Sequence, residues 1–223
     1  MNIEEYPDRD MLAIDVANIL AGELENCLLK HDFASFAVPG GTTPGPIFDV
    51  LCAADLDWSR VHVMLTDERW VPEDHARSNA ALIRERLLVE RAAKATFLPF
   101  YRAGQSAEAA ALEVSEILKA EMPISVLLLG MGTDMHTASL FPGAKGLSKA
   151  MAHGAPLLCP IEAEGQPEMR VSLSAQALDE AMSKHLVIFG DEKRAALQAA
   201  SKKAPEEAPI GAVMSEGTVH WAA

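Results

Sequence analysis

Apolar and polar positions along the chain form patterns that predict helices and strands in turn. Between positions 9 and 30, apolar residues recur every three or four positions, which predicts an amphipathic helix. The apolar run 33–38 ends at Pro39-Gly40-Gly41, a pattern typical of a buried strand that enters a turn. Thr43-Pro44 is typical of a helix cap followed by proline at the first helical position, so a helix should run from there to about residue 53.

The same alternation continues to the end of the chain. It predicts strands at 61–65, 124–129, 170–173 and 185–189, and helices at about 78–91, 107–120, 175–182 and 192–202. Two short runs, 210–213 and 218–221, flank a turn near the end. Strands that alternate with helices indicate a mainly parallel sheet with helices on both faces. We expect one α/β domain over residues 1–223, a length that can bury a sizeable core.

Three loops rich in glycine or charge directly follow predicted strands. They are residues 39–44, 66–78 and 130–143. The carboxyl ends of parallel strands meet at one edge of a sheet, and the catalytic loops of such sheets gather there. We therefore expect these loops to lie together.

The composition narrows the partners that this domain could bind. Apolar residues make up 49% of the chain and charged residues 23%, as in ordinary compact soluble proteins. A net charge of −13 argues against nucleic acid, because binding its phosphate backbone needs a basic face. Surface charge is screened over about 8 Å at physiological salt, so a locally positive pocket could still bind a small anion.

No segment of the sequence resembles a membrane span or a signal peptide. The longest apolar runs, such as 124–129, are too short to cross a bilayer, and residues 1–10 are acidic and polar. We therefore expect a cytoplasmic protein without a membrane partner.

The cysteines and histidines do not fall into metal-binding patterns. Cys27, Cys52 and Cys159 lie far apart, which predicts free thiols and neither a disulfide framework nor a cysteine zinc site. The seven histidines show no HxH or HExxH spacing, so we expect no bound metal. The absence of a GxSxG elbow leaves a serine-hydrolase mechanism without support.

The first loop, Gly40-Gly41-Thr42-Thr43-Pro44, has the composition of an anion-binding turn. Glycines let the backbone approach a ligand closely, and the following helix offers free N–H groups and the positive end of its dipole. The threonine hydroxyls add hydrogen-bond donors. The alternative is a plain strand-to-helix turn, and the lysine of a Walker motif is missing.

The second loop, Thr66 to Pro72, places Asp67 beside Glu68 and Arg69. Arg69 could contact a phosphate or an oxyanion, with Asp67 as its orienting partner. Asn79, at the start of the next helix, is placed to assist. The alternative is an ion pair that only holds the loop in place.

The third loop, 130–143, places His136 among small and hydroxyl residues directly after the most apolar strand. Histidine is the side chain best suited to general-base catalysis near neutral pH. A lone histidine is more often structural than catalytic, but this position favours a catalytic role.

These loops, in this order, resemble the 6-phosphogluconolactonase family over nearly the whole chain. The likeness covers 39–44, 66–72 and Ser78-Asn79, and it is strongest over 130–143. The segments 170–173 and 190–194 resemble the family's arginine strand and its lysine at a helix start.

The resemblance implies an α/β Rossmann-like fold shared with glucosamine-6-phosphate deaminases and ribose-5-phosphate isomerases. It also implies hydrolysis of 6-phospho-D-glucono-1,5-lactone to 6-phosphogluconate in the pentose phosphate pathway, without a cofactor. His136 aligns with the proposed general base. The implied phosphate or substrate contacts are the turn of Gly40, Gly41, Thr42 and Thr43, together with Arg69, Arg170 and Lys193. We add Asn79 and Gly132 as candidate substrate contacts.

Met135 stands where many relatives have glycine before the histidine. If that glycine serves a left-handed backbone, methionine costs roughly 1 kcal/mol there. We therefore expect a slightly altered loop with an intact histidine.

The mechanism expected from these residues is direct attack of water on the lactone carbonyl. His136 would remove the water proton, and Arg69 or the backbone N–H groups of 130–137 would stabilise the oxyanion. Asp67 would orient Arg69 or His136.

The 6-phosphate would be held by Arg170, Lys193 and the Gly40-Gly41 turn. The sequence alone leaves the three cations interchangeable, because Arg69, Arg170 and Lys193 could each bind phosphate or stabilise the oxyanion.

Two alternatives remain open at the level of sequence. A sugar-phosphate isomerase or deaminase of the same fold could use Asp67 as its base, but deaminase relatives usually carry Asn-Glu-Pro where this chain has Leu140-Phe141-Pro142. A non-catalytic sugar-phosphate-binding protein would bind without hydrolysis, and the sequence shows no output module that would support it.

Overall fold

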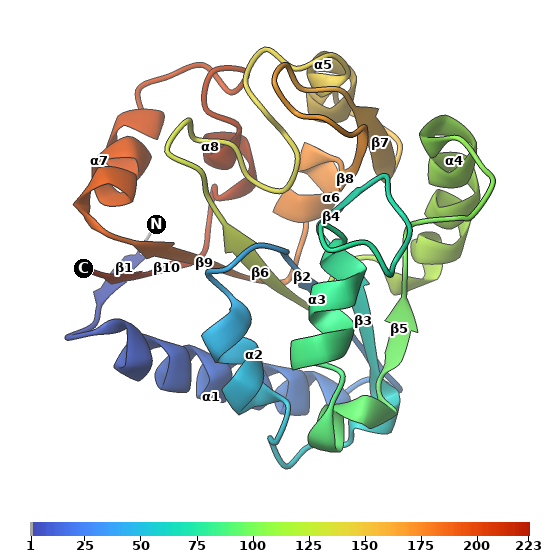
Figure 1. The fold of residues 1–223 in the computed structure, drawn as a ribbon. Helices are drawn as coiled ribbons and strands as arrows, with labels where there is room; N and C mark the ends of the chain where they lie inside the picture. The colour runs from blue at the N-terminus through green and yellow to red at the C-terminus, as the bar shows by residue number, and fades with distance from the viewer. Residues whose placement is uncertain (1) are drawn as a thin grey trace.

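The main sheet has seven strands, all parallel, in the order β1-β10-β9-β6-β2-β3-β5 (Figure 1). The computed structural model describes residues 2–223. The strands are β1 (Asn2–Glu5), β2 (Ala34–Val38), β3 (Val61–Leu65), β5 (Thr96–Leu98), β6 (Val126–Gly130), β9 (Ser183–Phe189) and β10 (Thr218–Ala222). The mainly parallel α/β sheet predicted from the sequence is confirmed.

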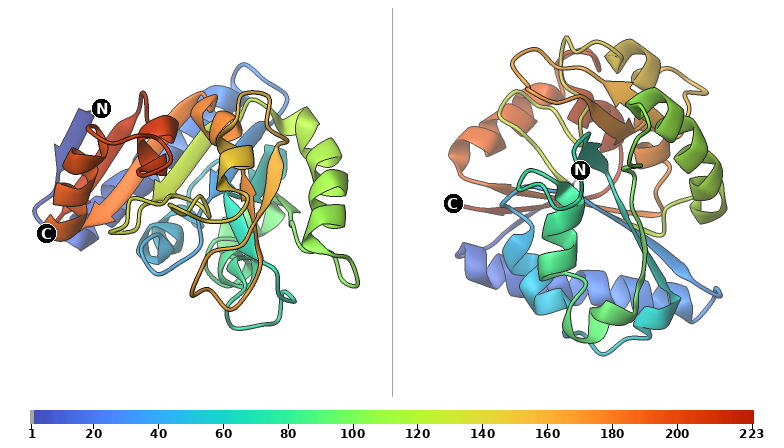
Figure 2. Two further views of the ribbon diagram at one scale, coloured as in Figure 1. Left: turned by 90° about the horizontal axis from the view of Figure 1, so that it is seen from above. Right: turned by 45° about the vertical axis from the view of Figure 1, so that its right-hand side comes forward.

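Helices cover both faces of this sheet. In Figure 1, α1 (Arg9–Leu28) and α2 (Gly45–Leu51) lie below it, with α3 (Asn79–Arg86) beside α2. Above it lie α7 (Asp191–Ala200) and α8 (Pro209–Val213). The remaining helices, α4 (Ala107–Leu118), α5 (Leu147–Met151) and α6 (Ala175–Asp179), pack near a second, smaller sheet (Figure 2).

Local sequence signals account for the longest helix. Asp8 caps α1, because its side chain accepts a hydrogen bond from the Met11 N–H at 2.8 Å. Leu12, Val16, Leu20 and Leu24 follow at a spacing of four residues and are fully buried. The helical spacing of the apolar residues therefore predicted both the helix and its buried face. Ser78 caps α3 in the same way, as expected, by accepting from the Ala81 N–H at 3.2 Å.

The second sheet corrects one part of the sequence-based prediction. The predicted strand 170–173 forms as β8 (Arg170–Leu173), but it joins no parallel strand. It pairs antiparallel with β7 (Leu158–Ile161) and with β4 (Asp67–Arg69), a segment for which the sequence pattern predicts a loop. The three charged residues of β4 show no apolar alternation, and the strand with which β4 pairs lies about a hundred positions further along the chain. The local sequence pattern could therefore not predict this strand.

Several element boundaries also differ from the prediction. Thr43 does not cap α2, because Pro44 occupies the cap position without a side-chain hydrogen bond and the helix begins at Gly45. The helix after Ser78 ends at Arg86 and not near residue 91, and a 3-10 helix at Glu90–Lys94 leads into β5. The short elements β1, β5, β7 and α5 were not predicted, because each is too brief to show a period.

The order of the strands creates the crevice in which the predicted loops meet. From β2 the chain moves outward through β3 to β5, and from β6 it moves outward in the opposite direction through β9 to β10. Ligands of open parallel sheets bind beyond the carboxyl ends of the strands at such a reversal. Residues 39–44, 66–78 and 130–143 follow β2, β3 and β6, so the expectation that they share one edge is confirmed.

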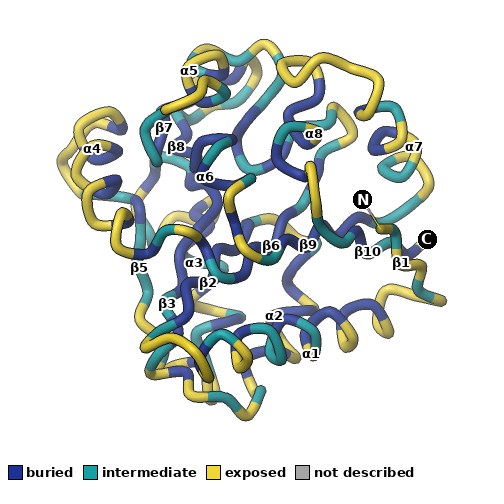
Figure 3. Tube along the Cα trace, turned by 180° about the vertical axis from the view of Figure 1, so that it is seen from behind, coloured by how far each residue is buried: buried dark blue, intermediate teal, exposed yellow. Residues whose placement is uncertain are grey.

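Burial follows the layered arrangement. The central strands are mostly buried, whereas exposed positions lie on the outer faces of the helices, on the loops and on the edge strand β1 (Figure 3). Cys52 and Cys159 are buried, Cys27 is half-buried, and none of these thiols is in a disulfide, as predicted. Among the helices of residues 2–223, none is long and apolar enough to span a bilayer.

Candidate active site

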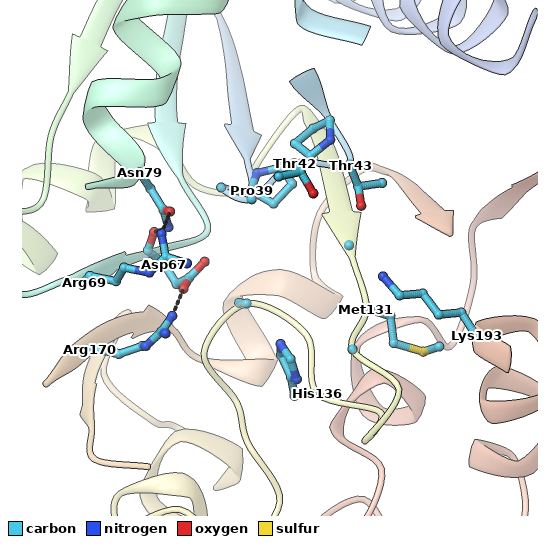
Figure 4. Close-up of a pocket in the computed structure, with 16 residues that line it drawn as sticks. Pro39, Thr42, Thr43, Asp67, Arg69, Asn79, Met131, His136, Arg170 and Lys193 are labelled. Atoms are coloured by element: carbon cyan, nitrogen blue, oxygen red, sulfur yellow. Dashed lines mark hydrogen bonds and ion pairs between the residues drawn. The ribbon is translucent and has the colours of Figure 1, made fainter. Parts of the chain in front are cut away.

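A pocket of about 270 Å³ opens at the carboxyl ends of the central strands (Figure 4). Every site residue predicted from the sequence lines it. These residues are Gly40, Gly41, Thr42, Thr43, Asp67, Arg69, Asn79, Gly132, His136, Arg170 and Lys193. Pro39, Pro44, Gly130, Met131 and Ala138 complete the lining. The structure thus brings together segments that lie far apart in the sequence, while the chemical role of each residue stays a prediction.

The glycine turn forms one wall, and its glycines are required for two different reasons. Gly41 has a φ of +87°, a left-handed conformation that side chains disfavour. A Cβ on Gly40 would lie 1.8 Å from the side-chain oxygen of Asn79. The turn can therefore approach Asn79 only because residue 40 has no side chain.

The second wall is β4, where Asp67 and Arg69 lie on the same side of the strand. Asn79 ties them together at the start of α3. Its amide donates to the Asp67 carbonyl at 2.8 Å, and its side-chain oxygen accepts from Nη1 of Arg69 at 2.9 Å. Arg170 lies directly opposite Arg69 in the antiparallel pairing of β4 with β8.

The carboxylate of Asp67 is buried and contacts a different partner from the one expected. We expected it to orient Arg69 or His136, but its Oδ2 lies 3.8 Å from Nη1 of Arg170. The Ser139 hydroxyl donates to the same oxygen, and the Thr66 hydroxyl donates to Oδ1 at 3.2 Å. Asp67 thus balances part of the charge of Arg170 and connects β4 to the histidine loop.

The pocket carries positive charge on opposite sides. Burial lowers the pKa of Arg170, and the charge of Asp67 opposes that shift. The Nε groups of Arg69 and Arg170 are buried and have no hydrogen-bond partner within residues 2–223. Lys193, at the start of α7, extends toward the pocket from the other side (Figure 4). Burial also lowers the pKa of Lys193, while Glu192 opposes the shift. This arrangement suits a dianionic ligand.

His136 stands between the two positive sides and is oriented by a carboxylate (Figure 4). Its Nδ1 lies 2.5 Å from Oδ1 of Asp134, and its ring contacts Phe141 at a centroid distance of 4.2 Å. A Cβ on Gly132 would lie 2.3 Å from the imidazole ring, so glycine is needed there too. Asp134 was not selected from the sequence, although an acid two residues before a candidate base was a usable signal.

The histidine loop uses much of its own backbone to hold its shape. The N–H of Gly132 donates to the His136 carbonyl at 3.0 Å, and that of Met135 donates to the Gly132 carbonyl at 3.0 Å. The N–H of His136 bonds to Asp134 at 3.3 Å. Met135 has a φ of 68°, so the left-handed backbone anticipated at this position is present, and the histidine still faces the pocket.

No group of three or more metal-ligating side chains is arranged to hold an ion in the part of the chain that the structure describes. The chemistry that the pocket itself offers is an oriented imidazole beside separate cations. Such a set can deprotonate water and bind a phosphorylated substrate.

Known proteins are similar to this chain in both sequence and fold. The family model described as glucosamine-6-phosphate isomerases/6-phosphogluconolactonase matches residues 7–221. A 6-phosphogluconolactonase from Pseudomonas aeruginosa is 41% identical over 209 residues, covering 91% of this chain and 87% of that protein. One from Rhizobium meliloti is 37% identical over 228 residues, covering 99% and 98%.

The similarity extends to the arrangement of the whole fold. The crystal structure of a 6-phosphogluconolactonase from Shewanella baltica has a TM-score of 0.95 and 32% identity, covering 100% of this chain and 98% of that one. A family match over nearly the full length, together with these relatives, leads to one conclusion. The chain belongs to the family of glucosamine-6-phosphate isomerases and 6-phosphogluconolactonases.

Proposed function

We propose that this chain, acting as a single α/β domain, hydrolyses 6-phospho-D-glucono-1,5-lactone to 6-phospho-D-gluconate. The reaction would serve the oxidative pentose phosphate pathway in the cytoplasm. The relatives named 6-phosphogluconolactonase support the substrate. The observation that carries the chemistry is the Asp134–His136 pair, which faces a pocket with cations on opposite sides.

His136 is the proposed general base. An ionised Asp134 can only accept a hydrogen bond, so its contact with Nδ1 favours the tautomer that has its proton on Nδ1. The lone pair of Nε2 is then available to take a proton from water as the water attacks the lactone carbonyl. After the attack, the protonated ring can donate to the departing ring oxygen.

Arg69 is the proposed oxyanion donor. The backbone N–H groups of 130–137 are the alternative, and three of them, those of Gly132, Met135 and His136, already bond within the loop. Arg69 is tied to Asn79 and carries a buried Nε without a partner in the described residues. Its uncompensated charge would stabilise an oxyanion, and removing one such donor typically costs about 3–4 kcal/mol of transition-state stabilisation.

The 6-phosphate is assigned to Lys193, Arg170 and the glycine turn. Lys193 has no acidic partner within 4.0 Å among residues 2–223, so its charge is available to a ligand. The Thr42 and Thr43 hydroxyls line the pocket beside the turn. Phosphate binding would fix the lactone with its carbonyl near His136, and such positioning lowers the barrier to reaction.

The test is the hydrolysis of 6-phosphogluconolactone generated in situ, with the spontaneous rate subtracted and EDTA present. We expect His136→Ala to lower kcat by roughly 10²–10⁴-fold, the usual contribution of a general base. The matched control is His153→Ala, since His153 is exposed and does not line the pocket.

A wild-type protein without turnover above the spontaneous rate would refute the proposed lactonase activity. Amino-sugar and pentose phosphates would then be tested as substrates. Near-normal turnover by His136→Ala would remove His136 from the mechanism while leaving the reaction in place. Binding of 6-phosphogluconate without turnover would favour the sensor alternative.

A further inference from the structure

Glu68 is a fully buried carboxylate that lies directly behind the pocket wall. It is 0% exposed and is absent from the pocket lining, although both of its neighbours on β4 line the pocket. Successive side chains of a strand point to opposite faces. Asp67 and Arg69 therefore face the pocket, and Glu68 faces the start of α3.

Each carboxylate oxygen of Glu68 accepts two hydrogen bonds there. Oε1 accepts from the backbone N–H of Asn79 at 2.7 Å and of Arg69 at 2.8 Å. Oε2 accepts from the Ala80 N–H at 2.8 Å and from the Ser78 hydroxyl at 3.1 Å. Burial raises the pKa of Glu68, and the N–H groups of Asn79, Ala80 and Arg69 oppose that shift.

This cluster of bonds reaches the pocket through Asn79. The side-chain oxygen of Asn79 accepts from the Arg69 guanidinium at 2.9 Å, and its amide holds the Asp67 carbonyl at 2.8 Å. The same side chain fills the space beside Gly40. One oxygen of Glu68 therefore fixes the backbone of Arg69 itself and of Asn79, one of the two residues that accept a hydrogen bond from the Arg69 guanidinium. The other is Arg77, whose carbonyl accepts from the same Nη1 at 2.8 Å.

We propose that Glu68 is a positioning residue that acts on the reaction through Arg69, by holding the backbone of Arg69 and Asn79 on a single carboxylate oxygen. This inference rests on the proposed lactonase function, because it assigns Glu68 an effect on that reaction. Glu68 itself does not touch the substrate.

Glu68→Gln tests the hydrogen bonding of Glu68 without changing the size of the side chain. The new amide group brings two donors to a place where four donors already converge. Whichever oxygen the amide group replaces, it faces the backbone N–H of Asn79 or that of Ala80, so a bond at the start of α3 must break and Asn79 shifts with the guanidinium that it holds.

The experiment is a double-mutant cycle that combines Glu68→Gln with Arg69→Ala. We expect Glu68→Gln alone to lower kcat/KM by about tenfold or more, and to lower it by less than about twofold when Arg69 is already alanine. It should also change the same parameter, kcat or KM, as Arg69→Ala does. A general structural role would instead lower kcat/KM equally in both backgrounds.

Glu73→Gln is the matched control, since Glu73 follows on the same loop and its only ion-pair partner among residues 2–223 is Arg84, at 2.8 Å. Neither residue lines the pocket. It should retain kcat/KM within twofold. Wild-type kcat/KM in Glu68→Gln, or an equal loss in both backgrounds, overturns the inference. If Glu68→Gln does not fold, Ser78→Ala removes one of the four donors to Glu68 together with the side-chain cap of α3. Its smaller loss of kcat/KM should likewise vanish beside Arg69→Ala.

The two proposals fail in different ways. A wild-type protein that turns over the lactone, beside a Glu68→Gln protein of equal activity, contradicts the role of Glu68 alone. A wild-type protein without turnover contradicts the proposed lactonase function. In that case the Kd for 6-phosphogluconate is measured for the same single and double variants. Equal weakening of binding in both backgrounds would overturn the inference there.

Discussion

At the scale of single residues, the site depends on glycines, which have no side chain, as much as on its functional side chains. Gly40 leaves room for Asn79, and Gly132 leaves room for the ring of His136. The functional side chains can approach the backbone closely only at such positions. A methyl group at either glycine would displace a residue assigned to the chemistry.

Gly40→Ala should lower kcat/KM, because the new Cβ would lie 1.8 Å from the Asn79 oxygen that holds Arg69. We expect a loss of roughly 10²-fold, the effect of misplacing a catalytic group by about 1 Å. Steady-state kinetics measure it.

The matched control is Gly22→Ala, since a Cβ on Gly22 in α1 would meet nothing within 4 Å. It should keep full activity and stabilise the protein by about 0.5–1 kcal/mol, as alanine does within a helix. Equal kinetics for the two alanine variants would contradict the role given to Gly40.

Asp134→Asn tests the carboxylate that the sequence reading did not select. Asparagine keeps the shape of the side chain but offers no charge to stabilise the protonated ring, so kcat should fall by roughly 10–10²-fold, less than for His136→Ala. The Kd for 6-phosphogluconate should change little, because Asp134 is not among the pocket residues assigned to binding. An unchanged kcat would show that the imidazole needs no partner.

At the scale of elements, the sequence was informative where the signal is local. Long apolar runs predicted β2, β3, β6 and β9, and helical spacing predicted α1 and α4. The adjacency of the loops then followed from the parallel sheet. The pairing of β4 with β8 could not be predicted, because it depends on contacts between distant segments whose short sequences carry no period. That pairing is what brings Arg170 beside Arg69.

The site shows the same division between local and distant information. The site residues predicted from residue types and from the order of the motifs all line the pocket. The contacts that these side chains make with one another could not be predicted in this way. Asp67 contacts Arg170 and Ser139, and Asp134 contacts His136, because these contacts depend on the exact path of the backbone.

Ser106→Ala tests whether helix caps stabilise this fold without affecting the site. Ser106 caps α4 by accepting from the Ala109 N–H at 3.2 Å. Its loss should lower the free energy of unfolding by about 1 kcal/mol. Urea denaturation measures this, and kcat/KM should remain within twofold because α4 contributes nothing to the pocket lining. An equal loss of activity would show that α4 and the site are coupled.

At the scale of the whole molecule, a partly buried chain of polar side chains joins α1 and the segment before it to β9 and β10. Nδ1 of His220 lies 3.0 Å from the Tyr6 hydroxyl, and its Nε2 lies 3.0 Å from Nδ1 of His185. Nε2 of His185 lies 2.8 Å from Glu23 of α1. Burial, helped by His185, lowers the pKa of His220 to about 4, while Glu23 opposes the shift.

This shift makes stability depend on pH. Since the pKa of His220 is lower in the folded protein than in the unfolded chain, the unfolded chain binds the proton more readily. The free energy of unfolding should therefore decrease as the pH falls from about 6.5 to about 4, by on the order of 2–3 kcal/mol. Urea denaturation at pH 7 and pH 5 measures the decrease.

His220→Phe should lower stability at pH 7, where it breaks two hydrogen bonds, and should also flatten the pH dependence above pH 4. The exposed His153→Phe serves as control and should retain the wild-type dependence. A His220→Phe protein that keeps the full decrease between pH 7 and pH 5 would assign that decrease to other groups.

The pairing of β1 with β10 also bears on the order of folding. Asn2 lies opposite Thr218, so β1 cannot pair with β10 until residues 218–221 have left the ribosome. The central strands β2 and β3 need no such delay, because they are close in sequence and pair directly. During synthesis, α1 has β2 to pack against long before β10 exists, although the finished helix contacts both. The sheet should therefore grow outward from its centre, and the edge made by the first strand should close last.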